Sequence, residues 1–429
     1  MSQEKKSVAI LVGGGPAPGI NGVISAAAIE AINRGHTVYG VQRGFHYLVK
    51  GDSSCLRELT IDDVSSIDRD GGSILGTSRE NPRSSADGVS QVVEALRSFG
   101  VGYLVTIGGD DTVSSAAAIA EAAKNEIAVA HVPKTIDNDL PLPDKASTFG
   151  FQSAREAGTE IVETLMVDAK TTGRWYLVVA MGRKAGHLAL GIGVSAGATL
   201  TLIPEEFGYK KIPIGLIADI IVGSALKRLV AGRPHGVAVL AEGLAELIDP
   251  ASVPEFANVE RDPHGNIRFA EIDLGGVLRK CIKSRFKQLG LDLVAVDKNV
   301  GYELRCVRPI PFDREYTRQL GYGVIDFLLN GGSGAMITRR SNELAPLPFG
   351  DIIDSTTGKS SIRLVDLESI YYKVATKYMI RLTREDLKNS ILVRKMASLT
   401  TVDTAELCKM FEAATASFVT YPAQFDIHK

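Results

Sequence analysis

Short runs of β-branched and other apolar residues alternate along the chain with longer segments whose apolar residues recur at helical spacing. The runs that predict strands lie at 8–12, 37–41, 103–107, 128–132, 176–180 and 236–240. Beyond residue 340 the pattern is weaker, with a strand-like run at 361–367 and a helical segment at 400–418. Strands that alternate with helices are typical of mostly parallel sheets covered by helices. The pattern therefore predicts an α/β fold.

The length of 429 residues allows two or three domains of ordinary size. Prolines precede a helical segment near residues 145–150, which indicates a crossing into a second domain. Prolines and arginines interrupt the pattern again around 302–323, where the chain is expected to return to the first domain. The predicted domains are 1–148, completed by part of 304–390, and 149–303, to which the C-terminal segment 391–429 is assigned.

The first predicted strand leads into a glycine-rich loop, "GGGPAPG", which opens a predicted helix. Backbone N–H groups at a helix N-terminus form a ready site for phosphate. The dinucleotide-binding fingerprint does not fit, because Pro18 stands where its third glycine belongs and Gln42 and Arg43 follow the next strand in place of an acid. The loop therefore predicts either a phosphate site or only a tight connection between strand and helix.

A second loop, "GGDDT", puts Asp110 and Asp111 at the start of the helix that follows the strand at 103–107. One aspartate would suffice to cap that helix and to interact with its dipole. Carboxylate oxygens at the mouth of a phosphate site are also suitable ligands for Mg²⁺. The residues alone leave both interpretations open and slightly favour the metal site.

Three further strand-end loops carry charged residues that suit a sugar-phosphate or phosphoryl site. In "PKTIDND", Lys134 and Asp137 lie in a loop stiffened by prolines. A carboxylate beside a substrate hydroxyl can act as a general base, and a lysine can neutralise phosphoryl charge, whereas the alternative for this loop is an Asx turn. In "MGRKAG", Arg183 suits bidentate contact with a phosphate. Glu242, after the last of the six strands, could either cap that end or hold sugar hydroxyls.

Composition narrows the class of ligand. The chain has 48 Lys and Arg against 50 Asp and Glu, a net charge of -2, so nucleic acid is not expected as a partner. No apolar run approaches the ~18 residues of a membrane span or forms the core of a signal peptide. The four cysteines form no CxxC pair. We therefore expect a cytoplasmic protein that binds small molecules and no membrane.

In their order along the chain, the loops "GGGPAPG", "GGSILGTSR", "GGDDT", "PKTIDND", "MGR" and "EG" and the later "YELR" and "RPIPFDR" resemble those of the phosphofructokinase family. The "GGDDT" and "PKTIDND" loops are similar to the pyrophosphate-dependent branch, whereas ATP-dependent members typically have "GGDGS" and "PGTIDND". The resemblance implies two Rossmann-like domains, the first for the phosphate donor and the second for the sugar phosphate. It also implies Mg²⁺-dependent, reversible transfer of phosphoryl from pyrophosphate to the 1-hydroxyl of fructose 6-phosphate.

The resemblance assigns roles to the matching residues. Asp137 is the expected general base, and Asp110 is the expected Mg²⁺ ligand. The transferring group is expected to be stabilised by Lys134, Arg79 and Arg183. The expected donor-binding residues are Gly14, Gly15, Gly109, Asp111 and Lys134. The expected sugar-phosphate residues are Thr135, Ile136, Asp137, Met181, Gly182, Arg183, Glu242, Tyr302 and Arg305. Arg174 matches a position that reaches the 6-phosphate from a neighbouring subunit, which implies a homodimer or homotetramer.

Three alternatives stay open at this point. They are an ATP-dependent phosphofructokinase, a pyrophosphate-dependent enzyme for another sugar phosphate such as sedoheptulose 7-phosphate, and a non-enzymatic sugar-phosphate sensor. Lys134 and Asp111 argue against the first, and the presence of Asp137 and Asp110 argues against the third. No residue decides the physiological direction of the reaction or the presence of effectors.

Overall fold

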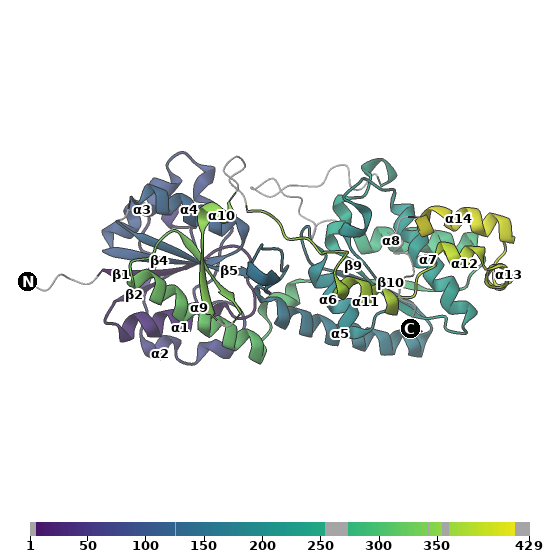
Figure 1. Ribbon diagram of the computed structural model, residues 1–429, viewed down its shortest axis with the longest axis horizontal. Helices are drawn as coiled ribbons and strands as arrows, with labels where there is room; N and C mark the ends of the chain where they lie inside the picture. Colours follow the sequence, from purple (N-terminus) through teal and green to yellow (C-terminus); the bar gives the residue numbers. More distant parts are fainter. Residues whose placement is uncertain (1–5, 125, 254–272, 342, 354–359, 417–429) are drawn as a thin grey trace, which may run out of the picture. The chain divides into compact units, whose positions relative to one another are not determined.

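The structure is a computed structural model that describes residues 6–124, 126–253, 273–341, 343–353 and 360–416 (Figure 1). The chain divides into two compact units. Unit 1 comprises Met1–Ala157 and Tyr302–Arg363, and unit 2 comprises Gly158–Gly301 and Leu364–Lys429. The chain thus enters unit 2 somewhat later than the predicted boundary at 148, and it enters unit 2 again at Leu364, within the predicted segment 304–390. The functions assigned to the two domains stay predictions.

Unit 1 is built on an eight-stranded sheet. Its strands are β1 (Ser7–Val12), β2 (Val38–Val41), β3 (Leu56–Glu58), β4 (Val101–Gly108), β5 (Ala128–Thr135), β6 (Phe149–Gly150), β11 (Ala335–Arg340) and β12 (Glu343–Pro348). Their order is β12-β11-β5-β4-β1-β2-β3, with β6 paired to β5. The central pairs are parallel, whereas β11–β12 and β2–β3 at the two edges are antiparallel. The carboxyl ends of β1, β4 and β5 therefore lie at one edge of the sheet.

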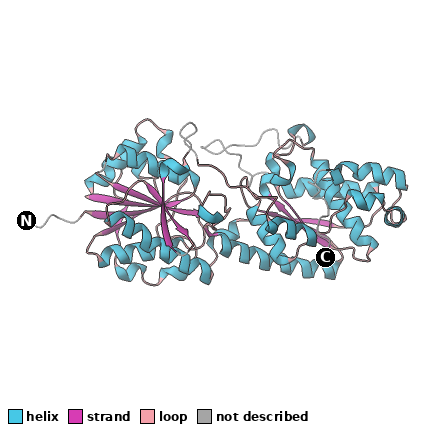
Figure 2. Cartoon of the chain, viewed as in Figure 1, coloured by secondary structure: helices cyan, strands magenta, loops and turns pink. Residues whose placement is uncertain are grey.

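Helices cover both faces of this sheet (Figures 1 and 2). They are α1 (Ile20–Asn33), α2 (Ile61–Val64), α3 (Gly88–Ser98), α4 (Asp110–Ala122), α9 (Pro311–Leu329) and α10 (Phe349–Ile352). Alternate residues of a strand point to opposite faces. Val8 and Ile10 join the core beneath α1 and α9, and Ala9 and Leu11 join the core beneath α3 and α4. Burial on both faces explains why β1 is a continuous apolar run.

Unit 2 contains a four-stranded parallel sheet in the order β10-β7-β9-β8, formed by β7 (Trp175–Ala180), β8 (Leu200–Leu202), β9 (Gly236–Ala241) and β10 (Ala295–Val300). Its helices are α5 (Phe151–Thr172), whose first residues belong to unit 1, α6 (His187–Ala196), α7 (Ile214–Val230), α8 (Leu274–Gln288), α11 (Ile370–Tyr378), α12 (Arg384–Lys388), α13 (Ser390–Ala397) and α14 (Thr404–Ala416). Apolar side chains of the sheet, α7, α8 and α14 form one core around the buried Trp175.

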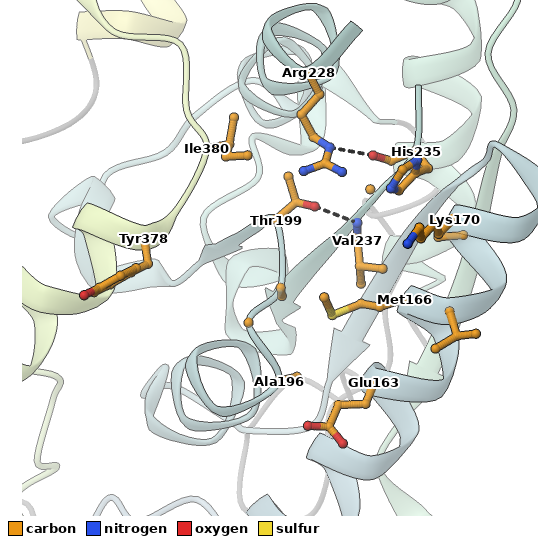
Figure 3. A pocket seen from close by; sticks show the side chains of 15 residues that line it. Glu163, Met166, Lys170, Ala196, Thr199, Arg228, His235, Val237, Tyr378 and Ile380 are labelled. Carbon is orange, nitrogen blue, oxygen red and sulfur yellow. Dashed lines mark hydrogen bonds between the residues drawn. The ribbon is translucent and has the colours of Figure 1, made fainter. Parts of the chain in front are cut away.

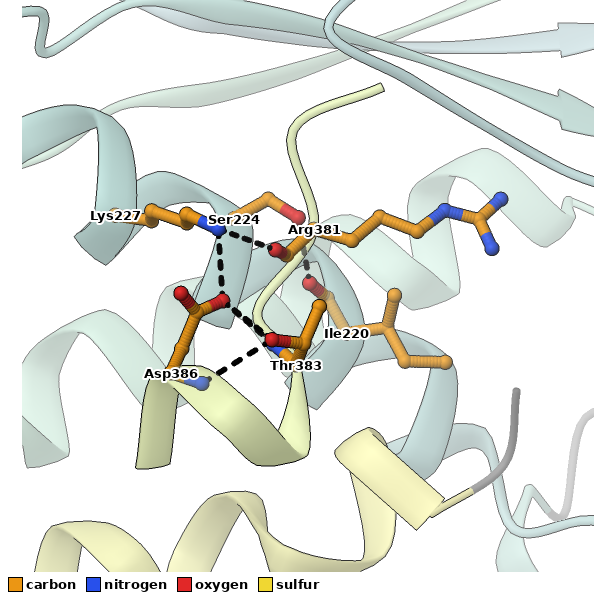
Figure 4. Close-up of polar contacts among 6 residues, drawn as sticks. All are labelled: Ile220, Ser224, Lys227, Arg381, Thr383 and Asp386. Carbon is orange, nitrogen blue, oxygen red and sulfur yellow. Dashed lines mark hydrogen bonds and ion pairs between the residues drawn. The ribbon is translucent and has the colours of Figure 1, made fainter. Parts of the chain in front are cut away.

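A lysine fastens the segment after α11 to α7 (Figure 4). Lys227 Nζ donates to the Arg381 carbonyl oxygen at 3.1 Å and lies 2.7 Å from Asp386 Oδ2. The same carboxylate oxygen accepts hydrogen bonds from the N–H and the hydroxyl of Thr383, which caps α12. These contacts hold the C-terminal helices against α7 within unit 2.

The α/β fold and all six predicted strands are confirmed, as β1, β2, β4, β5, β7 and β9, and the helical segment at 400–418 contains α14. The predicted strand at 361–367 is wrong. The backbone N–H of Arg363 donates to the Asp139 carbonyl oxygen, and that of Val365 donates to Glu205 Oε1. The backbone N–H groups of this run therefore donate to a loop and to a side chain instead of to a neighbouring strand. Among the helices of the described residues, none combines the length and the apolar character that a membrane crossing needs.

Candidate active site

The glycine loop that follows β1 packs against the start of α4. Gly13 N donates to the Ile107 carbonyl oxygen at 2.9 Å, and a Cβ on Gly13 would lie 2.5 Å from Thr112 Oγ1. Gly14 has a φ of 80°, a left-handed conformation that glycine adopts readily, and its N–H donates to the Ser78 carbonyl oxygen at 2.8 Å. That N–H is therefore not available to bind a phosphate. Because Gly14 has no side chain, a phosphate donor can still approach its backbone closely.

Two cations flank Gly14 and Gly15. Lys134, near the carboxyl end of β5, is buried, and its Nζ donates to the Gly15 carbonyl oxygen at 2.5 Å. The Arg305 guanidinium lies over the ring of Tyr302, with Cζ 4.9 Å from the ring centroid. A Cβ on Gly15 would lie 3.5 Å from the same Cζ. Lys134 and Arg305 therefore place positive charge beside this loop, which suits a phosphate-rich ligand. Arg305, predicted to bind the 6-phosphate of the acceptor, thus lies beside the loop predicted to bind the donor.

Asp110 and Asp111 form the first turn of α4, directly after Gly109 at its N-cap. The helix dipole stabilises negative charge at this position. Asp110 Oδ1 accepts the backbone N–H of Ser360 at 2.8 Å, so a distant segment orients this carboxylate. Arg79 is exposed and follows Ser78, whose backbone forms a bridge with Gly13. The predicted metal and donor residues of unit 1 therefore belong to neighbouring loops at one edge of its sheet.

Among the described residues, no group of three or more His, Cys, Asp or Glu is arranged to hold a metal ion. Mg²⁺ is commonly bound through one or two carboxylates, and substrate phosphates and water complete its coordination. Asp110 in the first turn of α4 meets this requirement, because it lies beside a loop suited to phosphate. The residues present therefore fit a Mg²⁺ ion that is bound together with a phosphate donor.

The loop after β5 presents Asp137. Its backbone N–H donates to Thr135 Oγ1 at 3.0 Å, which forms a tight turn beside the buried Ile136. Within the described part of the chain, the Asp137 carboxylate makes no hydrogen bond or ion pair, and the residue is half-buried. The next residue, Asn138, has a left-handed φ of 56°. A partly exposed carboxylate with no protein donor is able to accept a proton from a substrate.

In unit 2 the predicted sugar-phosphate residues lie at the carboxyl ends of two neighbouring strands. Ala180, the last residue of β7, pairs with Ala241, the last residue of β9, so residues 181–183 and Glu242 leave the sheet side by side. Gly182 N donates to Glu242 Oε2 at 3.2 Å. The structure therefore brings Met181, Gly182, Arg183 and Glu242 together.

Arg174 lies at the other end of the same strand. It immediately precedes Trp175, the first residue of β7, and its carbonyl oxygen accepts the N–H of Gly236 at the start of β9. A strand of this length spans about 20 Å. Within one chain, Arg174 is therefore not brought together with residues 181–183.

A pocket of ≈ 370 Å³ in unit 2 contains none of the predicted site residues (Figure 3). Arg228 and Val237 both contribute to its lining, and Arg228 Nε donates to the His235 carbonyl oxygen at 2.6 Å. Val237 N donates to Thr199 Oγ1 at 3.1 Å. Burial lowers the pKa of His235, and the nearby cations, Arg228 first, lower it further. The pocket lies at the amino end of β9, whereas Glu242 follows its carboxyl end, so the pocket is separate from the predicted site.

Three residues that contact the predicted site were missed. Thr77 Oγ1 donates to the Gly14 carbonyl oxygen at 2.5 Å, and Thr77 belongs to the "GGSILGTSR" loop that resembles the family. Ser360 contacts Asp110, and Arg363 contacts the loop after Asp137. No local pattern in the sequence marks Ser360 as a site residue, and Arg363 lies in the run at 361–367, whose pattern predicts a strand.

Comparison with known proteins identifies the family. The family description "Phosphofructokinase" matches residues 7–328. The pyrophosphate–fructose 6-phosphate 1-phosphotransferase of Thermotoga maritima is 51% identical over 385 residues, which cover 89% of this chain and 92% of the relative. A protein of the same name from Naegleria fowleri is 48% identical over 415 residues, 95% of each chain. The solved structure of a pyrophosphate-dependent phosphofructokinase from Nitrosospira multiformis is similar in fold, with a TM-score of 0.67 and 17% identity over 92% of each chain. The chain belongs to the phosphofructokinase family.

Proposed function

We propose that this chain transfers a phosphoryl group from pyrophosphate to the 1-hydroxyl of fructose 6-phosphate, giving fructose 1,6-bisphosphate and phosphate. The names of the relatives from Thermotoga maritima and Naegleria fowleri support these substrates. The observation that carries the choice of donor is the buried Lys134, whose ammonium is fixed on the Gly15 carbonyl oxygen. A fixed cation against this loop suits a compact phosphate donor, and the carboxylate of Asp111 at the start of α4 disfavours the remainder of a nucleotide.

Asp137 accepts the proton of the 1-hydroxyl while that oxygen attacks a phosphorus atom of pyrophosphate. The new oxygen–phosphorus bond forms, the bond to the bridging oxygen breaks, and phosphate leaves. Catalysis of such transfers depends mainly on alignment and on neutralisation of charge. Lys134, Arg79 and Arg183 supply positive charge, and the backbone at Gly14, Gly15 and Gly109 allows close approach of the donor. Asp110 would hold Mg²⁺, which supplies further neutralisation of the phosphate charge when bound.

The acceptor residues are assigned by the chemistry of their side chains and by resemblance to the family. Thr135, Ile136, Met181, Gly182 and Glu242 are proposed to hold the sugar, and Tyr302 and Arg305 to hold the 6-phosphate. Arg174 lies at the opposite end of β7 from residues 181–183. We therefore include a homodimer or homotetramer in the proposal, with Arg174 acting on the site of a neighbouring subunit. We also infer a cytoplasmic location, since both substrates are highly charged phosphates that do not cross membranes.

Parallel assays test the proposal. With Mg²⁺ and either pyrophosphate or ATP, the assay measures fructose 1,6-bisphosphate formed from fructose 6-phosphate, and then sedoheptulose 1,7-bisphosphate formed from sedoheptulose 7-phosphate. We expect turnover with pyrophosphate, little with ATP, and loss of activity with EDTA that excess Mg²⁺ restores. A larger kcat/KM with ATP would overturn the donor, and a larger kcat/KM with the heptulose would overturn the acceptor. Binding of sugar phosphate without turnover on either donor would indicate a sensor.

A further inference from the structure

One arginine from a distant part of the chain braces the loop that follows Asp137. Arg363 Nη2 donates to the Asn138 carbonyl oxygen at 2.7 Å and also to Asn138 Oδ1, and Nε donates to the same carbonyl at 3.1 Å. Arg363 Nη1 donates to the Ala146 carbonyl oxygen at 2.8 Å. The backbone N–H of Arg363 donates to the Asp139 carbonyl oxygen at 2.7 Å. A single residue therefore bonds to both ends of the segment 138–146.

The braced residue, Asn138, has a backbone that needs support. Its φ of 56° lies in the left-handed region, which asparagine tolerates better than most residues but which still carries strain. Asn138 is buried, and its Oδ1 also accepts the N–H of Thr148 at 3.0 Å. Without the guanidinium, the Asn138 carbonyl would lose its donors in a buried setting, which is unfavourable enough to shift the loop. Asp137 is the adjacent residue and would move with it.

The contacts require an arginine. The guanidinium is planar and rigid, so one group can donate to three oxygens on Asn138 and Ala146 at fixed angles. An ammonium on a flexible stem has no such fork. Burial lowers the pKa of Arg363, while the charge of Asp139 raises it.

We propose that Arg363 is a positioning residue for phosphoryl transfer, which fixes Asn138 and thereby orients the Asp137 carboxylate toward the 1-hydroxyl. Arg363 acts through the loop backbone and is distinct from the residues assigned to the donor and the acceptor. The inference rests on the proposed function, in which Asp137 is the general base.

Kinetics of Arg363→Ala and Arg363→Lys test this role. Because displacement of a catalytic group by about 1 Å can lower the rate by about 10²-fold, we expect kcat to fall by about 10- to 100-fold in both variants. The KM values for pyrophosphate and fructose 6-phosphate should stay within about twofold, because no binding residue is removed. Added guanidinium ion should restore part of kcat in Arg363→Ala and none in Arg363→Lys, whose side chain still fills the site.

Arg34→Ala is the matched control. Arg34 belongs to the same unit and pairs with Glu30 at 2.7 Å and Asp326 at 2.8 Å, on helices α1 and α9. Its removal should leave kcat unchanged. A higher KM with unchanged kcat in the Arg363 variants, or an equal loss of kcat in Arg34→Ala, would overturn the positioning role. If Arg363→Ala does not fold, the result of Arg363→Lys decides.

Hydrogen exchange provides a measurement that does not depend on the donor. Peptides covering 135–148 should exchange faster in Arg363→Ala or Arg363→Lys than in the unaltered chain, while the rest of unit 1 is unchanged. Unchanged exchange at 135–148 would refute the brace. If the unaltered chain uses ATP in place of pyrophosphate, the same kcat comparison is made with ATP, so failure of the proposed donor is distinguishable from failure of the Arg363 role. If it uses neither, the proposed function and the positioning role both fail, and hydrogen exchange tests only the brace itself.

Discussion

Asp137 and Asp313 are two aspartates of unit 1 whose surroundings suit opposite tasks. Asp313 is fully buried, and its carboxylate accepts hydrogen bonds from the backbone N–H groups of Gly150 and Ser153 and from the Ser153 hydroxyl. Burial raises the pKa of Asp313, although these donors lower it in part. Its carboxylate joins α9 to the start of α5 and is saturated with donors. The Asp137 carboxylate, which has no bond within the described residues, is the one available for proton transfer.

Asp137→Asn tests the general base. The amide keeps the shape of the side chain but cannot accept the hydroxyl proton, so we expect kcat to fall by about 10²- to 10⁴-fold, or roughly 3 to 5 kcal/mol of barrier. Steady-state kinetics with both substrates measure the change, and the KM values should move little. Near-normal turnover in a folded variant would remove Asp137 from the mechanism.

Asp111 and Lys134 are the residues through which donor choice can be tested. Asp111→Gly removes a charge from the first turn of α4, with an expected loss of about 0.3 to 1 kcal/mol of stability. We expect the ratio of kcat/KM for ATP to that for pyrophosphate to rise, and to rise further when Lys134→Gly is added. Asp87→Gly is the control, because it also removes an acidic residue at the start of a helix, the neighbouring α3. It should leave the ratio unchanged. A double variant that stays folded without detectable ATP turnover would show that other residues set the donor.

At the scale of elements, burial determines which strands the sequence could predict. The six predicted strands are almost entirely buried, and their apolar runs are continuous. The sequence "AVDKNV" of β10 has two exposed residues, and "ELAPLP" of β12 carries prolines that only an edge position tolerates, so neither resembles a buried strand. The run at 361–367 shows the opposite error, because its sequence predicts a strand that the structure does not contain. It has the pattern of a strand, yet Arg363 bonds to a loop 225 positions earlier in the chain.

The residues of the candidate site also divide into those whose position local sequence predicts and those that only the folded chain brings in. The positions of Lys134 and Asp137 in unit 1 and of Arg183 in unit 2 follow from the sequence, because parallel strands bring their carboxyl-end loops to one edge of their own sheet. The roles of these residues stay predictions. Ser360 and Arg363 could not be predicted, because their roles arise from contacts that only the folded chain creates. Arg174 could be placed in a neighbouring subunit only by resemblance, since no local pattern marks a residue that acts across an interface.

His131 in β5 provides an acid-sensitive contact beneath the donor loops. Its Nε2 donates to the Gly108 carbonyl oxygen at 3.0 Å, so Nδ1 is the acceptor for the Thr106 hydroxyl at 2.8 Å. Burial lowers the pKa of His131 to about 3. Below the ordinary pKa of about 6.5, the unfolded chain binds a proton at His131 that the folded chain does not bind. The free energy of unfolding therefore decreases as the pH falls from about 6.5 toward 3.

His131→Gln isolates this effect. The amide can still donate to the Gly108 carbonyl oxygen but does not titrate. We expect the unaltered chain to be more stable at pH 7, and its advantage to shrink by up to about 1.4 kcal/mol per pH unit on acidification. Urea unfolding of both proteins between about pH 7 and pH 5 measures the difference. A constant difference across that range would contradict the assignment of His131 as a buried neutral side chain.

At the scale of the whole molecule, the proposed function predicts that a neighbouring subunit completes the site. Arg174 lies at the amino end of β7, whereas Met181 follows its carboxyl end, so one copy of Arg174 cannot serve the loop at the other end of its own strand. In the proposed homodimer with two-fold symmetry, each copy would supply Arg174 to the other. Charge-assisted contact with the 6-phosphate would then depend on assembly.

Mixing two inactive variants tests this exchange. Asp137→Asn lacks the base and Arg174→Ala lacks the shared cation, so each homodimer should have little activity. When the two are coexpressed and assort at random, about half of the dimers contain one copy of each, and one of their two sites has both native residues, so about a quarter of the original activity should return. If Arg174 served its own chain, every site in the mixed dimer would lack one of the two residues and no activity would return. The mixture therefore distinguishes a shared site from a self-contained one by rate alone, and sizing chromatography of the same sample confirms that the variants assemble.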